Sequence, residues 1–78
     1  MNSEENEIMR DVYRYLNTHA DPPAPTDPSA VEWWIRACDD MNEIMNKHKQ
    51  HSLAVRLLSE VYWYLEEKGK KKNERTQE

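Results

Sequence analysis

The residues most able to do chemistry are two histidines with acidic side chains upstream of them. His48 and His51 are three positions apart, and Asp39, Asp40 and Glu43 precede them. Imidazole and carboxylate groups are common ligands of transition metals, so a metal site is one interpretation. A zinc site needs ligands that converge from two elements, whereas one His-x-x-His at a helix junction arises easily by chance. We therefore expect no metal: His48 should complete an apolar stripe and His51 should lie in a turn.

Paired acids suggest a second chemistry, the hydrolysis of a nucleoside triphosphate. All-helical nucleotide pyrophosphatases hold magnesium through Glu-x-x-Glu and Glu-x-x-Asp motifs, and the nearest counterparts here are Glu4-x-x-Glu7 and Asp40-x-x-Glu43. The first pair falls in the opening turn of a helix, and 15 acidic residues among 78 make such spacings common. This enzyme class is kept as an alternative. We expect a non-enzymatic protein, with no catalytic residue, cofactor or small-molecule ligand.

The charge distribution disfavours a nucleic-acid surface. The net charge is −4 and the isoelectric point is near 5.3, whereas phosphate binding relies on clustered lysine and arginine. A recognition helix after Ser52 would offer only Arg56 as a basic side chain before its last residue. The basic run Lys68–Lys72 favours solubility over specific binding. A nucleic-acid accessory protein is therefore an alternative with little support.

Two tryptophans are the best candidates for a contact surface. On a helix, Trp63 falls among charged neighbours that include Arg56 and Glu60, and Trp33 also lies off the apolar stripe. Tryptophan is enriched at binding hot spots, so these four residues form a candidate interaction surface for a protein partner or a second copy. The alternative is that the first helix or a proline-rich connector covers one or both rings, because a small domain needs such cover.

One of these tryptophans also distinguishes two nearly identical hexapeptides. Asp-Val-Tyr-Arg-Tyr-Leu at 11–16 and Glu-Val-Tyr-Trp-Tyr-Leu at 60–65 differ mainly where Trp63 replaces Arg14. The match indicates either a pseudo-symmetric pair of terminal helices or a coincidence of common helical residues. Under both interpretations the two copies should bury the same face.

Composition limits the chain to one domain with a small core. A domain of 78 residues buries only about 60% of the surface that its unfolded chain exposes. The single cysteine, Cys38, has no partner for an internal disulfide, lies on the apolar stripe and is not expected to act as a nucleophile. No apolar leader or membrane span is evident, so we expect a cytoplasmic location and no membrane partner.

Helical periodicity then predicts an all-α fold, a three-helix bundle with a disordered C-terminal tail. Helices are expected near 4–19, 28–47 and 52–68, the last two forming an antiparallel hairpin with the first packed across them. Asn2 or Ser3 should cap the first helix, Asp27-Pro28 the second and Ser52 the third, and Gly69 should end the third. Residues 1–69 form the domain, with a stiff proline-rich connector at 21–27, and residues 70–78 form the tail.

The apolar stripes of these helices define the expected core. The second helix carries a seam that repeats at alternating spacings of three and four residues, from Val31 to His48. The side chains expected in the core are Ile8, Val12, Leu16, Val31, Trp34, Ile35, Cys38, Met41, Met45, Leu57, Leu58, Val61 and Leu65.

Residues 33–68 also carry a family resemblance. The matching residues are Trp33-Trp34, Asp39-Asp40, Ile44, Lys47-His48, Leu57-Leu58 and Tyr64-Leu65-Glu66-Glu67-Lys68. In this pattern the chain resembles short uncharacterised helical proteins of phages, prophages and mobile elements of Firmicutes. The resemblance implies a helical fold in a bacterial or phage setting, and it implies no activity. With the exposed tryptophans, it favours a small interaction or accessory module.

Overall fold

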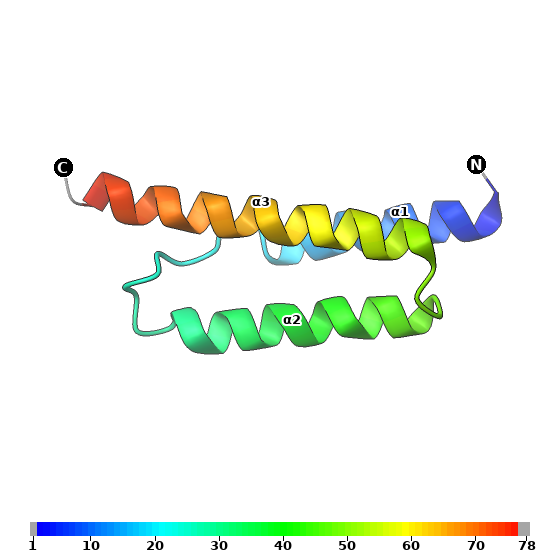
Figure 1. Ribbon diagram of the computed structural model, residues 1–78, viewed down its shortest axis with the longest axis horizontal. Coiled ribbons are helices and arrows are strands. Elements are labelled where there is room, and N and C mark those ends of the chain that lie inside the picture. Colours follow the sequence, from blue (N-terminus) through cyan, green and yellow to red (C-terminus); the bar gives the residue numbers. More distant parts are fainter. Residues whose placement is uncertain (1, 77–78) are drawn as a thin grey trace.

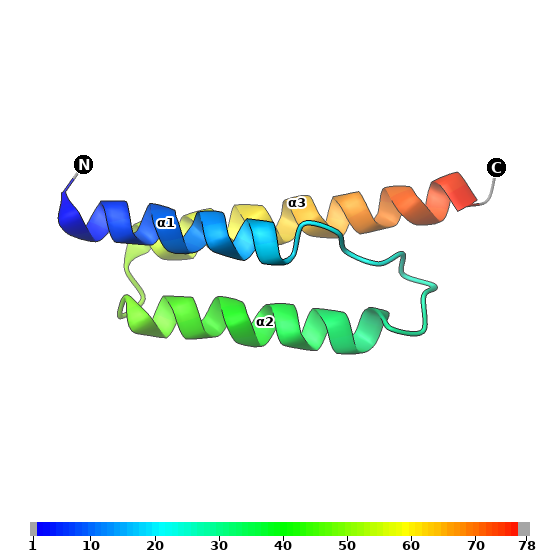
Figure 2. The ribbon, with the colours of Figure 1, turned by 180° about the vertical axis from the view of Figure 1, so that it is seen from behind.

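The molecule is an elongated bundle of three helices (Figure 1). The computed structural model describes residues 2–76, with helices α1 (Ser3–Thr18), α2 (Ala30–Lys47) and α3 (Ser52–Thr76) and no strand among these residues. Helix α2 runs antiparallel to α3, and α1 runs beside α3 in the same direction (Figures 1 and 2). The predicted all-α class and the antiparallel hairpin are confirmed. Helix α1 lies along the hairpin rather than across it.

The first helix begins after the polar residue Asn2, as the sequence indicated, whereas the second begins two residues later than expected. The Asn2 side chain accepts a hydrogen bond from the Glu5 amide at 2.8 Å, and the Glu5 carboxylate accepts one from the Asn2 amide at 2.9 Å. Asp27 accepts hydrogen bonds from the amide and hydroxyl of Ser29. These bonds shape a turn before the helix proper, so α2 begins at Ala30, two residues later than predicted.

A tight turn joins α2 to α3. The Gln50 amide bonds to the Met45 carbonyl at 2.8 Å and the Lys49 amide to the Asn46 carbonyl at 3.0 Å, the hydrogen-bond pattern of a Schellman motif. Lys49 and Gln50 have φ of 53° and 59°, in the left-handed region that favours glycine. The ring nitrogen Nδ1 of His51 accepts the Leu53 amide at 3.1 Å. His51, not Ser52, therefore caps α3.

Helix α3 extends well past its predicted end near Lys68. Gly69 is helical and buried, and a Cβ placed on it would lie 2.9 Å from the Pro23 carbonyl oxygen. The fully buried Pro22 ring lies next to it. Gly69 thus lets the connector approach the helix and does not end it. Of the tail predicted at 70–78, residues 70–76 belong to α3, and residues 77–78 lie outside the described part of the chain.

Lysine side chains fasten the connector to this extension of α3. Lys68 donates a hydrogen bond to the Ala20 carbonyl oxygen. Lys72 donates to the Pro22 carbonyl oxygen at 2.7 Å and pairs with the Asp21 carboxylate. The proline-rich connector is therefore bound to α3, and it lies beside this helix beyond the end of α1 (Figure 2).

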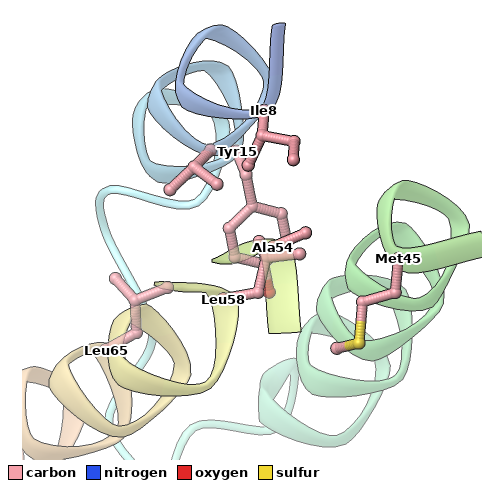
Figure 3. Close-up of a cluster of buried hydrophobic side chains, with 7 residues drawn as sticks. Ile8, Tyr15, Met45, Ala54, Leu58 and Leu65 are labelled. Carbon is pink, nitrogen blue, oxygen red and sulfur yellow. The ribbon is translucent and has the colours of Figure 1, made fainter. Parts of the chain in front are cut away.

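The core gathers where all three helices overlap (Figure 3). Its buried apolar side chains are Ile8, Val12, Tyr15, Met45, Ala54, Leu58 and Leu65. Five of these were predicted, and the predicted Leu16, Trp34, Met41, Leu57 and Val61 pack against them half-buried. The prediction was wrong for Val31 and Ile35, which are 73% and 57% exposed. Cys38 is only partly buried.

The two hexapeptides do not occupy equivalent environments. Tyr15 is buried and donates a hydrogen bond to the Ala37 carbonyl oxygen at 2.9 Å, whereas its counterpart Tyr64 is 54% exposed. Tyr13 is 68% exposed, whereas its counterpart Tyr62 is half-buried between α2 and α3. The expectation that both copies bury the same valine and leucine face is nevertheless confirmed, although the tyrosines differ: Val12 and Leu65 are buried in the core, and Leu16 and Val61 pack against it.

Candidate functional site

The predicted surface around Trp63 is open. Trp63 lies on the outer side of α3 with its side chain 60% exposed, and Arg56 and Glu60 on the same helix are also exposed. Its indole contacts the ring of Tyr62, with ring centroids 5.5 Å apart. Neither α1 nor the connector covers this tryptophan.

Trp33 has a different environment from Trp63. It is half-buried, with its ring 5.4 Å from the imidazole of His19 at the end of α1 and 4.8 Å from Trp34. The connector residues Pro23 and Ala24 line the same hollow as Trp33. The covered-ring alternative therefore holds for Trp33. Trp33 and Trp63 do not lie on one continuous face, although a row of rings joins them through Trp34 and Tyr62, which are 5.2 Å apart.

An apolar groove separates α2 from α3 at the end of the molecule that α1 does not reach. Its volume is about 720 Å³, and its lining residues include Pro23, Val31, Trp34, Ile35, Cys38, Asp39, Tyr62, Glu66 and Lys70. The exposed Val31 and Ile35 form one wall of the groove. Because Tyr62 lines this groove and also touches Trp63, the exposed indole lies beside the groove.

Val31 and Ile35 are exposed because the side of α2 that faces α1 carries Ala37 instead. Ala37 is fully buried and its carbonyl oxygen accepts the Tyr15 hydroxyl. Each residue turns an α-helix by about 100°, so Ala37 lies about 160° around the helix from Ile35. In a bundle of three helices, two opposite sides of α2 are not both covered by neighbours, so the side that carries Ile35 is exposed.

A second, polar groove lies between α1 and α2 and has a volume of about 440 Å³. It lies beside two histidine–aspartate pairs of the same kind. Asp11 of α1 bonds to His48, which follows α2, at 2.7 Å; Asp40 of α2 bonds to His19, which follows α1, at 3.0 Å. In both helices the histidine is the C-cap and follows its own aspartate by eight residues. The antiparallel packing of α1 and α2 therefore joins each aspartate to the other helix's histidine.

The pair at Asp11 is the more enclosed. Asp11 and His48 are each 7% exposed, and Lys47 contacts the same carboxylate oxygen at 2.9 Å. Burial by itself would raise the pKa of Asp11, but the hydrogen bonds from His48 and Lys47 together outweigh it, so the pKa lies below its usual range. In the same groove, burial raises the pKa of Tyr15 to about 12.

The remaining predicted chemical groups do not converge. Glu7 pairs with Lys47 at 3.3 Å, and Asp40 is engaged by His19. His51 caps α3 while His48 binds Asp11. Across the described residues, no group of three or more histidine, cysteine or acidic side chains is arranged to hold a metal ion. The two buried histidines connect α1 and α2 through their ring nitrogen Nε2.

The apolar groove and the paired aspartates and histidines were not predicted from the sequence. The repeated Asp-x7-His spacing was the available signal for the polar groove. For the apolar groove, the available signal was the width of the apolar stripe on α2, which Ile35 extends beyond the seam.

Comparisons with known proteins assign no family to this arrangement. No family model matches the chain, and neither a curated protein nor a solved structure matches it. Within the described residues, no helix has the length and apolar character needed to cross a bilayer.

Proposed function

We propose that the protein is a small, non-enzymatic interaction module that binds an amphipathic helix in the groove between α2 and α3. The observation that carries this proposal is the exposure of Val31 and Ile35, two apolar side chains one helical turn apart on the wall of an apolar groove. Grooves between helices commonly receive the apolar face of another helix. The resemblance to short phage and prophage proteins supports a bacterial or phage setting.

The energetics favour covering this groove. Full burial of a valine or isoleucine side chain contributes about 1.5–3 kcal/mol relative to exposure. Trp34 and Tyr62 supply aromatic surface in the same groove, and aromatic residues are enriched where interfaces derive most of their binding energy. Exposed Trp63 touches Tyr62, so it borders the proposed binding site. The other members of the surface predicted from the sequence, Trp33, Arg56 and Glu60, do not line the groove.

No specific observation favours the two other function classes. Glu7 and Asp40, one acid from each possible magnesium-binding pair, are each bonded to a basic side chain. Lys70 and Lys71 of the basic run pair with Glu66 and Glu67 on their own helix, which reduces the positive field that a phosphate backbone would meet.

Affinity capture with matched variants tests the proposed function. The tagged chain, its Val31→Asp/Ile35→Asp variant and its Tyr13→Asp variant would be produced in a bacterial host. Recovered proteins, including an untagged copy of the chain, would be identified and their direct binding remeasured with purified components. Tyr13 is a control because it is exposed on α1 and does not line the groove. Direct binding lost only in the double variant is expected. Equal binding by all three chains would contradict the proposal.

A further inference from the structure

We propose that the helix received by the groove is α2 of a second copy of this chain, bound in antiparallel register about a two-fold axis. The inference rests on the proposed function and names its partner. Each copy supplies both parts of such a contact. Val31 and Ile35 protrude from α2, and Trp34 and Tyr62 line the depression beside them.

The order of residues along the groove gives it opposite charges at its two ends. Because α2 and α3 are antiparallel, the start of α2 lies level with the later part of α3. Val31 and Lys70 therefore lie toward one end, Ile35 and Glu66 near the middle, and Asp39 toward the other end with Tyr62. Residues 31 to 39 rise by about 12 Å along the helix axis. Lys70 therefore places a basic side chain, paired with Glu66 of its own helix, at one end of the groove, and Asp39 places an acidic one at the other.

A two-fold axis near Ile35 places the basic end of the groove in one copy opposite the acidic end of the groove in the other. It places Lys70 of each copy against Asp39 of the second copy, and it brings the two Ile35 side chains together. The Glu66 side chains approach the axis, where their repulsion is reduced because each pairs with Lys70 of its own helix at 3.0 Å. A parallel arrangement would instead place Lys70 near Lys70 and Asp39 near Asp39. Charge complementarity therefore selects the antiparallel register.

The shape of the single chain agrees with a missing neighbour at this end. Its radius of gyration is 13.8 Å and its extents are 47 × 21 × 17 Å. A compact chain of this length has a radius of gyration of about 11.5 Å. The elongation arises where α3 and the start of α2 continue beyond α1 (Figure 2). A second copy against the groove would give this end a further pair of helices.

Sedimentation equilibrium of the full chain from micromolar to millimolar concentration provides the first test. The wild-type chain should form a dimer, and Val31→Asp should raise the dissociation constant about tenfold or more. Tyr13→Asp, which introduces the same charge on the exposed side of α1, should leave the dissociation constant within about threefold. Circular dichroism of each variant would show that its helices are retained. A monomeric wild-type chain would overturn the second copy as the partner.

Charge reversal tests the register. Asp39→Lys lowers the net negative charge, which by itself should favour association, yet it should weaken the dimer because it opposes Lys70 of the second copy. Adding Lys70→Glu should restore most of the wild-type dissociation constant. A strengthened dimer in Asp39→Lys, or no recovery in the double variant, would contradict the antiparallel register.

Disulfide formation gives an independent readout of the register. In a Val31→Cys variant, the new thiol lies about 10.5 Å from Cys38 of its own helix, which is too far for a disulfide. The antiparallel dimer brings it near Cys38 of the second copy, so oxidation should yield covalent dimers. A Val31→Cys/Cys38→Ala variant should yield few, and equal crosslinking by the two variants would overturn the register.

The experiments distinguish the second copy as the partner from the proposed function of the groove as a binding site for a helix. If the wild-type chain is monomeric but the Val31→Asp/Ile35→Asp variant still loses direct binding to a different protein, the second copy is wrong and the proposed function holds. If the wild-type chain dimerises equally well with or without Val31→Asp, the two copies meet on another surface and the proposed pairing is wrong, whereas the proposed function is still decided by the binding of the Val31→Asp/Ile35→Asp variant to other proteins.

Discussion

Gly69→Ala should destabilise the protein even though it places the best helix-forming residue inside a helix. In an ordinary helix interior this change gains about 1 kcal/mol, because alanine loses less conformational freedom than glycine. Here the added Cβ would lie 2.9 Å from the carbonyl oxygen of Pro23 and 3.7 Å from the Cβ of Pro22. The closest atom belongs to the backbone, so the contact is relieved only by moving the connector or the helix.

The magnitude follows from these opposing effects. Adding atoms to a packed site costs about 1–3 kcal/mol, and a backbone neighbour places this site in the upper part of that range. Moving the connector would also expose the buried Pro22 ring and strain the hydrogen bond from Lys72 to its carbonyl oxygen. After the helix-propensity gain is subtracted, the free energy of unfolding should fall by about 1–2 kcal/mol.

Urea denaturation followed by circular dichroism measures this change directly. For a chain of this size, the melting temperature should fall by about 5–15 °C. Lys71→Ala is the matched control, since Lys71 is exposed on the same helix and does not line the groove, so its replacement should change the free energy by no more than about 0.5 kcal/mol. An alanine variant at position 69 that is as stable as the wild-type chain, or more stable, would refute the docking of the connector against α3.

Three further perturbations test other contacts. Asp11→Ala should lower the free energy of unfolding by about 2–3 kcal/mol at pH 7, because it leaves buried His48 without its acceptor. The lowered pKa of Asp11 means that this contribution is present above about pH 4 and is lost as the pH falls further, so a difference undiminished at pH 2.5 in urea titrations would contradict it. Tyr15→Phe should remove the phenol that titrates near pH 12 in an absorbance titration, together with stability that the wild-type chain retains below pH 10 and loses as the pH rises through 12; an unchanged titration curve would contradict this assignment. Lys49→Gly should raise the free energy of unfolding by about 0.5–1 kcal/mol because φ at this position is 53°, and a less stable variant in denaturant titrations would oppose that reasoning.

Local sequence features predicted the helices well because their signals act over a few residues. Asn2 and Glu5 cap α1 through side chains three positions apart, and Asp27 orders the turn before α2. Gly69 was misinterpreted because its role depends on Pro23, which is distant in the sequence and contacts it only in the fold. A glycine that ends a helix and one that admits a neighbour are indistinguishable without that contact.

The sequence was less informative about the candidate site because periodicity identifies an apolar stripe but not its neighbour. Val31 and Ile35 belong to the same apolar stripe as Met45 of the core, yet they are exposed because α2 turns the side with Ala37 toward α1. The polar and charged helical neighbours of Trp63 left open whether another element covers its ring; the ring is exposed, whereas Trp33 contacts His19 at the end of α1. In each case, contacts between helices determine whether the side chain is buried or exposed.

Site-specific photo-crosslinking tests most directly whether the groove between α2 and α3 is the contact surface. A benzophenone side chain would replace Ile35, which lines this groove, or its neighbour Arg36, which lies on the side of α2 nearer α1. The two probes differ by one position and share the same helix and expression background. Irradiation should yield a defined protein adduct from position 35, with the mass of a second copy if the dimer is correct, and little from position 36. Equal adducts from both positions, or adducts from position 36 alone, would contradict the groove as the contact surface.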